Sequence, residues 1–535
     1  MDFSHFSLLF PDEKTQQDHF EGRNVPDIDM FTLQELGLLE LFTLKNSELA
    51  EFFTMDPAVM RYRMEAFRDM LDNEQIAETL NRLMPVLGDI LELRRMESDS
   101  GDTANYLLSI TEIELYISCI GILHEGLSRE AENLHSDAFR TLADRIRELA
   151  ESDYYKQLNK KLEELTQRVR EIRSVTIGVN LDQQLRPREA GVLSINAVPF
   201  KSGDIIDKIL RLNFKGDEYT CIANLVPFGK KQSDNEKTAL SLAFNSAIND
   251  VYKSSLRSWK QIVQNYVLEN TDFLLNLIPE FELLVRGTEF LRQLKKKGCI
   301  LTEPDIRPVS DHACILKDLY NPCVALKIDG DVVPNDLDYD EQAGIYVLTG
   351  PNRGGKSVIT CALGLCQVMM QLGMFVPARE AILSPVDAIY THFPTGAEDT
   401  IDKGRLGEEC ARLSEIFENI TSDSLVLLDE SLSSTGSFEA SYIASEVLAG
   451  LACAGCRCLF STHLHELAAK IDEINELTKP RGGIRIDTLV AGIGEEGSRS
   501  FKIIRTKPDG KSYARDIAGR YGLTYDNILK MIGKQ

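Results

Sequence analysis

The sequence has no excess of basic residues. Of its 535 residues, 59 are Lys or Arg and 83 are Asp or Glu, which gives a formal net charge of −24. This balance favours a soluble protein and argues against a simple polycationic clamp for DNA. It does not exclude a basic groove, because the field that a nucleic acid meets is local, within a Debye length of about 8 Å.

The sequence also lacks a leader pattern and a membrane-spanning run. Residues Met1–His5 contain no basic stretch followed by an apolar core, so no signal peptide is expected. The most apolar long segment, Ile359–Val376, contains Gln367, Gln371 and two glycines, which favours a buried helix over a membrane span. We therefore expect a cytoplasmic protein that does not act at a membrane.

The cysteines also lack the regular spacings that are typical of a disulfide-bonded protein. The eleven cysteines are scattered, which suits a reducing compartment. Cys453, Cys456 and Cys458 lie close together, so a metal site is one interpretation. The favoured alternative is that they are small apolar side chains beside the buried run Cys458–Phe460.

The first 310 residues predict a helical region. Segments such as Phe31–Leu44 and Pro57–Leu71 carry apolar residues at spacings of three and four. Between Leu158 and Ile172 the apolar steps tighten to alternating fours and threes, as in a coiled coil, although an ordinary amphipathic helix explains so short a pattern equally well.

Residues 174–232 interrupt this helical region with short β-prone runs. We expect a small β-containing insertion, followed from Ser233 to Pro279 by a long helix without Gly or Pro. A long helix on each side would make the insertion the tip of a lever pair. Its basic residues could contact phosphate, although a solvated surface of mixed charge is the default interpretation; they are Arg186, Arg188, Lys201, Lys208, Arg211, Lys215, Lys230 and Lys231.

From residue 311 to 535 strands and helices alternate, which predicts an α/β domain built around a phosphate loop. The apolar run Ile345–Leu348 predicts a strand, and a segment without proline from Val358 to Leu372 predicts a helix. In this order, loop N–H groups and the helix N-terminus face a phosphate, Lys356 reaches the β- and γ-phosphates, and the Ser357 hydroxyl can hold Mg²⁺. The loop between them reads Gly350-Pro351-Asn352-Arg353-Gly354-Gly355-Lys356-Ser357. The alternative is a glycine-rich turn without a ligand.

Two further apolar runs end in residues that could bind a metal ion, transfer a proton or contact phosphate. Ser424–Leu428 predicts a buried strand that delivers Asp429 and Glu430 at its carboxyl end, where an open α/β sheet binds ligands. Asp429 would hold Mg²⁺ and Glu430 would accept a proton from the attacking water. The strand Arg457–Ser461 leads to His463, which could sense a γ-phosphate. His465 is expected to start a helix or to lie at the surface.

Together these elements predict an ATPase of the ABC type. No guanine-reading Asn-Lys-x-Asp and no kinase His-Arg-Asp is present in the appropriate place, which argues against a GTPase or a kinase.

The sequences of these motifs resemble those of the MutS family of DNA mismatch-repair ATPases. Thr349–Ser357 is similar to the family's Thr-Gly-Pro-Asn-Met-Gly-Gly-Lys-Ser, Gly373–Ala378 to its Gly-x-Tyr/Phe-Val-Pro-Ala, and Ser461–Leu467 to its Ala-Thr-His-x-His-Glu-Leu. Tyr320–Pro322 and Val333–Asp336 fall where the family has its His-Pro and Pro-Asn-Asp elements.

The resemblance implies a fold and a set of ligands. It implies a mixed fold, with a helical core and lever region over residues 1–310 and an ABC-type ATPase domain over 311–535. It also implies ATP and Mg²⁺ as ligands, a homodimer with composite ATP sites, and contacts to the nucleotide from the whole loop together with Val358 and Asn335. Lys356, Glu430 and His463 would be catalytic, and Ser357 and Asp429 would hold the metal.

Some positions depart from the family pattern. Leu406 stands where the family's Ser-Gly-x-Ser-Thr-Phe signature has a serine, so only the Gly407 backbone and a helix expected to start near Glu408 could approach phosphate on the partner subunit. Hydrolysis is therefore expected to be slow. The loop after Glu430 differs from the family's Leu-Gly-Arg-Gly-Thr-Ser, and Val332 replaces an aromatic residue that stacks on adenine.

Two hypotheses for the function follow. Because the sequence shows no mismatch-reading domain with a Phe-x-Glu wedge, the first is a MutS-like clamp that binds DNA, either mismatched or branched. The second is an ATP-driven clamp or scaffold of the same fold that acts on proteins or RNA.

Overall fold

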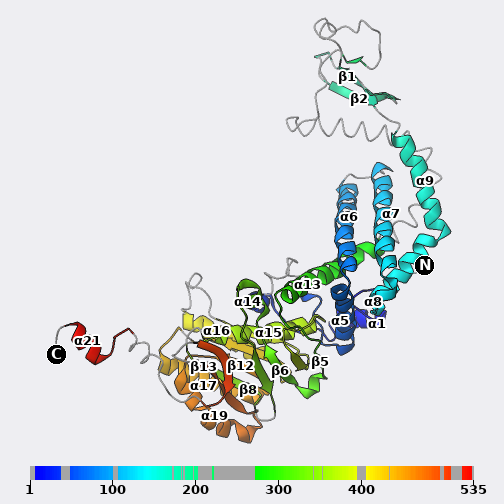
Figure 1. Ribbon diagram of the computed structural model, residues 1–535. Helices are drawn as coiled ribbons and strands as arrows, with labels where there is room; N and C mark the ends of the chain where they lie inside the picture. The colour runs from blue at the N-terminus through cyan, green and yellow to red at the C-terminus, as the bar shows by residue number, and fades with distance from the viewer. Residues whose placement is uncertain are drawn as a thin grey trace. The chain divides into compact units, whose positions relative to one another are not determined.

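The computed structural model describes most of the chain (Figure 1). The described residues are 6–37, 49–99, 106–170, 174–181, 183–184, 187–196, 198–199, 201–202, 220–221, 272–340, 343–351, 354–393, 405–432, 434–493, 499–507 and 521–532. Their contacts divide them into two units, each of which is described by itself. The first contains Gln75–Glu132 and Arg140–Ile278, and the second contains His5–Glu74, Asn133–Phe139 and Pro279–Gln535.

Helices dominate the first unit. They are α6 (Glu74–Asp99), α7 (Tyr106–Arg129), α8 (Asp137–Glu151) and α9 (Asp153–Arg170), with the short η1 (Ala131–Asn133) before α8. On α6, Leu80, Leu83, Leu87 and Ile90 are fully buried at the spacing of one helical face. Where α7 passes α6, Gly126 is required, because a Cβ there would lie 2.0 Å from the Thr79 hydroxyl.

Strands occur in the segment where the sequence predicts short β-prone runs. β1 (Ser174–Leu181) and β2 (Pro187–Asn196) pair antiparallel, and β3 (Lys201–Ser202) pairs with β4 (Thr220–Cys221). Most of its basic residues lie outside the described residues, as does the helix expected from Ser233 to Pro279. The phosphate-contacting face and the lever pair therefore remain predictions.

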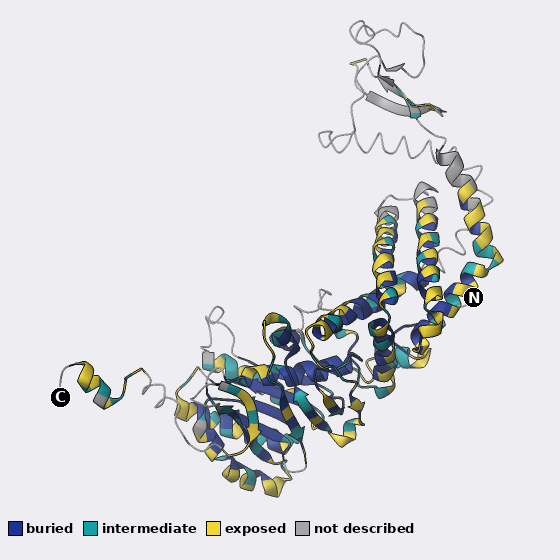
Figure 2. Cartoon of the chain, in the orientation of Figure 1, coloured by how far each residue is buried: buried dark blue, intermediate teal, exposed yellow. Residues whose placement is uncertain are grey.

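A six-stranded sheet forms the centre of the second unit. Its order is β10-β11-β12-β8-β13-β14, and every pairing is parallel except that of β13 with β14. The strands are β8 (Ile345–Thr349), β10 (Ile389–His392), β11 (Leu425–Asp429), β12 (Arg457–Ser461), β13 (Ile486–Ile493) and β14 (Arg499–Arg505). Every residue of β8, β10, β11 and β12 is buried (Figure 2), as the apolar runs of β8, β11 and β12 predict.

Helices and a smaller sheet cover this core. The helices are α14 (Pro322–Lys327), α15 (Lys356–Gln371), α16 (Arg405–Asn419), α17 (Ser437–Ala454), α18 (His465–Ala469) and α19 (Ile471–Thr478), with the short η2 (Val309–Asp311) and η3 (Lys479–Arg481). The smaller sheet has the order β5-β9-β6-β7. Its strands are β5 (Asp305–Ile306), β6 (Cys314–Leu319), β7 (Asn335–Tyr339) and β9 (Glu380–Leu383).

Helix α15, the predicted phosphate-loop helix, lies between the two sheets and contacts β11, β12 and β6. Its polar residues near the C-terminal end are buried and satisfied. Gln371 donates from Nε2 to the carbonyl of Val386 (3.0 Å), and its Oε1 accepts from Gln367 (2.9 Å). A protein core therefore explains this apolar segment, and no described helix is both long enough and apolar enough to cross a membrane.

Residues near the N-terminus also belong to this second unit. Asp27 forms a parallel bridge with Ala388, and α2 (Met30–Glu35) packs against β10. Further along, buried Arg63 of α5 (Pro57–Asp72) donates to the carbonyl of Leu9 (3.0 Å). Residues 5–74 and 279–310 therefore group with the α/β part, which differs from the predicted boundary at 310; as a division between family domains, that boundary stays a prediction.

The remaining elements of this unit are α1 (Glu13–Phe20), α13 (Ile278–Lys296) and α21 (Tyr525–Met531). Helix α13 ends in lysines and is followed by Gly298 with a φ of 76°, which confirms the expected helix C-terminus. Cys456 and Cys458 are fully buried apolar side chains. Cys453 of α17, by contrast, is exposed, so the apolar interpretation describes Cys456 and Cys458 but not Cys453.

Candidate functional site

The phosphate loop leaves β8 and enters α15 as the sequence predicts. Gly350 has a φ of 139°, and a Cβ on it would lie 2.7 Å from the Cβ of Ala491. Gly355 caps α15 with a φ of 92°, a conformation that side chains other than glycine rarely adopt. The fold therefore requires glycine at both ends of the loop. Asn352 and Arg353 lie outside the described residues.

Lys356 is buried beneath the loop that it follows. Its ammonium donates to the carbonyl oxygens of Gly350 (3.2 Å) and Pro351 (3.3 Å), and it lies 3.4 Å from Nδ1 of His463. Burial lowers the pKa of this ammonium, while the nearby carboxylates of Glu430 and Asp429 oppose that shift. The lysine is thus held at the phosphate loop by weak contacts to neutral carbonyl groups.

Asp429, at the end of β11, has the properties of a metal ligand. It is 4% exposed, and its Oδ1 is buried without a hydrogen-bond partner among the described residues. Burial raises the pKa of Asp429, whereas a hydrogen bond with the Ser357 hydroxyl lowers it. A carboxylate and a hydroxyl side by side, with one carboxylate oxygen unused, form a donor set that suits Mg²⁺.

Glu430 and His463 lie beside this pair. The backbone N–H of Glu430 donates to the carbonyl of Ser461 (2.8 Å), which fixes the residue against β12. Its Oε1 lies 2.6 Å from Nε2 of His463, and both side chains are 35% exposed. The carboxyl group is therefore oriented by the imidazole and open to solvent. His465 begins α18, as expected.

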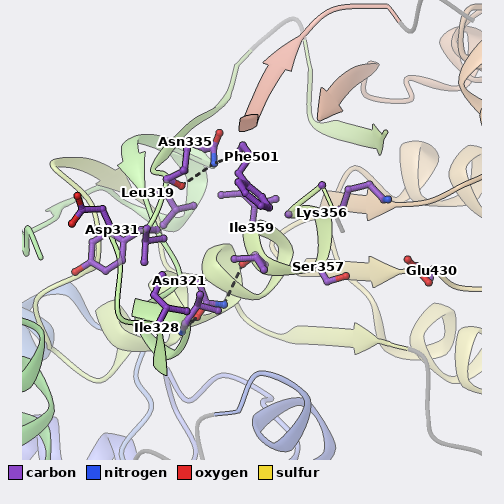
Figure 3. A pocket seen from close by; sticks show the side chains of 17 residues that line it. Leu319, Asn321, Ile328, Asp331, Asn335, Lys356, Ser357, Ile359, Glu430 and Phe501 are labelled. Carbon is purple, nitrogen blue, oxygen red and sulfur yellow. Dashed lines mark hydrogen bonds between the residues drawn. The ribbon is translucent and has the colours of Figure 1, made fainter. Parts of the chain in front are cut away.

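A cavity of about 420 Å³ adjoins the phosphate loop (Figure 3). Gly354, Lys356, Ser357 and Glu430 line it on one side. Apolar side chains dominate the other lining residues, which are Leu319, Tyr320, Asn321, Val324, Ile328, Asp331, Val332, Val333, Asn335, Gly355, Val358, Ile359 and Phe501. Groups that can bind phosphate line one side of the cavity, and apolar groups that can contact a base line the other. This combination suits a nucleotide.

Asn335 lines the cavity, but its amide serves the protein itself. Nδ2 donates to the carbonyl of Phe501 (3.1 Å), and Oδ1 accepts from the N–H of Ile503 (2.7 Å). These bonds hold Phe501 beside the loop, where a Cβ on Gly355 would lie 3.6 Å from its ring. Local sequence gave no signal for Phe501, because a strand pairing brings it to a loop about 150 residues earlier in the chain.

The region of Leu406 and Gly407 differs from expectation. Helix α16 begins at Arg405 rather than near Glu408, so both residues lie in its first turn. Leu406 is partly buried against the apolar core around β11 and β12, and Gly407 is exposed. Neither residue lines the described cavity. A contribution from this segment to a second subunit's site stays a prediction.

Comparison with known proteins gives two matches to family models. The model for MutS domain V matches residues 346–489, and the model for the MutS2 N-terminal domain matches residues 55–296. The first match covers the phosphate loop, the Asp-Glu pair and His463. The second covers most of the helical region.

Individual relatives agree with these matches. The chain is 39% identical over 163 residues to a protein of Gallus gallus named DNA mismatch repair protein Msh6, covering 28% of this chain and 12% of the relative. Proteins named DNA mismatch repair protein MutS are 35% identical over 233 residues in Methanothrix thermoacetophila and 33% identical over 271 residues in Pseudothermotoga lettingae. These alignments cover 41% and 48% of this chain but 25% and 31% of the relatives.

The aligned region thus spans less than a third of each of these relatives. The model for MutS domain V nevertheless includes the nucleotide-site motifs, and the two family models match separate regions of the chain. On the strength of these matches and of the motifs that line the cavity, the chain belongs to the MutS family.

Proposed function

We propose that this protein is a Mg²⁺-dependent ATPase whose nucleotide state controls clamp-like binding of DNA. One observation carries the proposal. Lys356, Ser357, Asp429, Glu430 and His463 come together at the carboxyl ends of the adjacent strands β8, β11 and β12, beside a cavity of about 420 Å³. Ligands bind at this edge in open α/β sheets.

The site residues have distinct roles in this proposal. The loop N–H groups, the N-terminus of α15 and the Lys356 ammonium bind the phosphates, with the lysine exchanging its carbonyl partners for phosphate oxygens. Ser357 and Asp429 would hold Mg²⁺, which when bound neutralises charge on the β- and γ-phosphates. The buried Oδ1 of Asp429, which has no hydrogen-bond partner among the described residues, would gain one in the metal ion.

Proton transfer is assigned to Glu430. A carboxylate accepts the proton of the attacking water while the γ-phosphoryl group passes to that water and ADP leaves. His463 bridges Lys356 and Glu430, with its Nδ1 facing the lysine and its Nε2 facing the carboxylate. It is therefore placed to respond to an arriving γ-phosphate and to orient Glu430 at the same time.

The apolar side of the cavity would hold the nucleobase, with Phe501 as its aromatic wall. We expect Phe501→Ala to weaken ATP binding by about tenfold with little change in kcat, because stacking of a base on an aromatic ring contributes about 1–3 kcal/mol. A fluorescent ATP analogue would measure the affinity. Ile504→Ala is the matched control, since Ile504 is exposed on the same strand and does not line the cavity. Equal affinities for wild type and Phe501→Ala would contradict this assignment.

DNA is the proposed partner, and a homodimer with composite sites is the proposed assembly. The names of the relatives, which are DNA mismatch repair proteins, support the first. Family membership and the β-containing insertion among helices support a clamp formed by the helical region. Either mismatched or branched DNA fits this proposal.

A second candidate is an ATP-driven clamp or scaffold that acts on proteins or RNA. Two features favour it. The net charge of −24 argues against a simple polycationic clamp for DNA, and Leu406 stands where the family's signature has a serine. ATP would be used in the same site under either candidate.

Removal of the metal tests the ATPase proposal. The full chain is expected to release inorganic phosphate from ATP in Mg²⁺ and to lose this activity in excess EDTA, because Ser357 and Asp429 then have no cation to present to the phosphates. Phosphate release that is equal with and without Mg²⁺, or its absence under both conditions, would argue against the proposal.

A further inference from the structure

The backbone after β11 turns through two left-handed residues that are not glycine. Glu430 has a φ of 49° and Leu432 has a φ of 65°. Such conformations are unfavourable for residues with a Cβ and persist only where the surrounding structure enforces them. Leu432 is held by burial in the core (1% exposed), and the N–H of Glu430 is held by the Ser461 carbonyl, which leaves the turn between these two residues to be fixed by a further contact.

The residue between them, Ser431, supplies such a constraint through His392 on the neighbouring strand. His392 Nδ1 lies 2.7 Å from the Ser431 hydroxyl oxygen, and that hydroxyl donates to the backbone carbonyl of His392 (3.1 Å). The two contacts are compatible when Nδ1 carries a proton and donates to the hydroxyl oxygen. Both residues are buried, at 6% and 4% exposed.

His392 is itself held firmly in place. β10 pairs in parallel with β11, so that His392 lies opposite Leu428. The N–H of Phe393, the next residue, donates to Glu35 of α2 (3.2 Å), and the Thr391 hydroxyl donates to Thr32 (3.1 Å). The imidazole therefore projects toward Ser431 from a strand end that is fixed on its other side.

The surroundings keep the ring neutral. The pKa of His392 is lowered to about 4, chiefly by burial and also by the Arg412 guanidinium of α16, while backbone hydrogen bonds with His392 and Glu409 oppose the shift. Glu35, on α2, is the nearby carboxyl on the other side, and burial raises its pKa to about 7. We therefore expect a neutral imidazole at His392 near pH 7.

We propose that His392 and Ser431 are positioning residues for ATP hydrolysis, because their reciprocal hydrogen bonds fix the left-handed turn that aims the Glu430 carboxylate. This inference rests on the proposed ATPase function. It assigns neither residue a contact with the nucleotide: both are absent from the lining of the described cavity. Its consequence is a loss of turnover without a loss of ATP affinity when the bonds are removed.

Four variants separate positioning from general support of the fold. Ser431→Ala removes the hydroxyl, and His392→Leu keeps much of the ring volume without a donor. His392→Asn places an amide nitrogen near the position of Nδ1 and should rescue the bond. Ser384→Ala is the matched control, because Ser384 is equally buried and hydrogen-bonded, to Pro308 (2.6 Å), but lies away from the turn.

The expected result is a fall in kcat of about tenfold for Ser431→Ala and for His392→Leu, with the ATP dissociation constant within about twofold of wild type. His392→Asn should stay within about threefold of the wild-type kcat, as should Ser384→Ala. The double variant Ser431→Ala/His392→Leu should be no slower than the slower single variant, because the two changes break the same pair.

Hydrogen exchange gives a readout that does not depend on activity. In Ser431→Ala and His392→Leu, the amides of Glu430–Leu432 should exchange at least about tenfold faster than in wild type, whereas Ser384→Ala and His392→Asn should not change them. If wild type hydrolyses no ATP, the proposed function fails, and exchange still decides whether the pair fixes the turn. Unchanged exchange in Ser431→Ala, or a wild-type kcat in that variant while the wild type is active, would overturn the inference.

Discussion

Replacing Glu430 by Gln is expected to stop ATP turnover and to leave ATP binding intact. The amide keeps the shape of the side chain and a hydrogen-bonding atom near His463, but it cannot take a proton from water. General-base catalysis typically contributes about 10²–10⁴-fold to a rate, so kcat should fall by at least about 100-fold. Steady-state phosphate release measures the first effect and equilibrium binding of ATP the second.

Glu446→Gln is the matched control for this experiment. Glu446 is exposed on α17, away from the nucleotide site. Its substitution by Gln removes one negative charge, as Glu430→Gln does. The control should hydrolyse ATP like the wild type. A Glu430→Gln variant that keeps the wild-type kcat would show that another group takes the proton.

The second large effect is expected from Lys356. Lys356→Met keeps an unbranched side chain in the buried position but removes the charge, so binding of ATP should weaken by about 10–100-fold. This range follows from the loss of one or two charge-assisted hydrogen bonds, at about 1.5–3 kcal/mol for a bond to a charged group. The melting temperature should change little, because the ammonium that is removed is partly desolvated by burial.

Titration with ATP and Mg²⁺ measures the affinity of this variant. Lys479→Ala, which removes an exposed lysine far from the phosphate loop in sequence, controls for the loss of a positive charge. If Lys356→Met binds ATP as tightly as Lys479→Ala, the phosphates do not sit against the loop in the way proposed.

The sequence was sufficient for the parts of the site that lie within single elements. An apolar run followed by glycines and Lys356 predicts strand, loop and helix, because each of these preferences is local. The Asp429-Glu430 pair was found for a similar reason, since a buried strand must end where its residues become polar. All three predicted strands occur with nearly the predicted bounds.

What the sequence could not provide depends on which strands become neighbours. Phe501 reaches the phosphate loop only because β14 pairs with β13 and Asn335 holds it there. His392 meets Ser431 only because β10 and β11 are adjacent. The bridge between Asp27 and Ala388 was not foreseen either, since a single bridge leaves no periodic pattern.

The start of α16 also differs from the expected position. From the sequence we expect this helix to start near Glu408, whereas it begins at Arg405. Leu406 packs against the apolar core, and this tertiary contact outweighs the low helix propensity of Gly407. Boundaries set by packing are not visible in local propensities.

The measurement that tests the account most directly is the rate of ATP hydrolysis by the full chain as DNA is added. Matched duplex, mismatched duplex and branched DNA would be compared at about 50 mM and about 200 mM salt, since phosphate contacts predict a steep loss of binding with salt. We expect at least one of these DNAs to bind and to change the Mg²⁺-dependent rate at low salt, with a weaker effect at high salt. Hydrolysis that no DNA alters, together with no binding of any DNA at either salt concentration, would contradict this expectation.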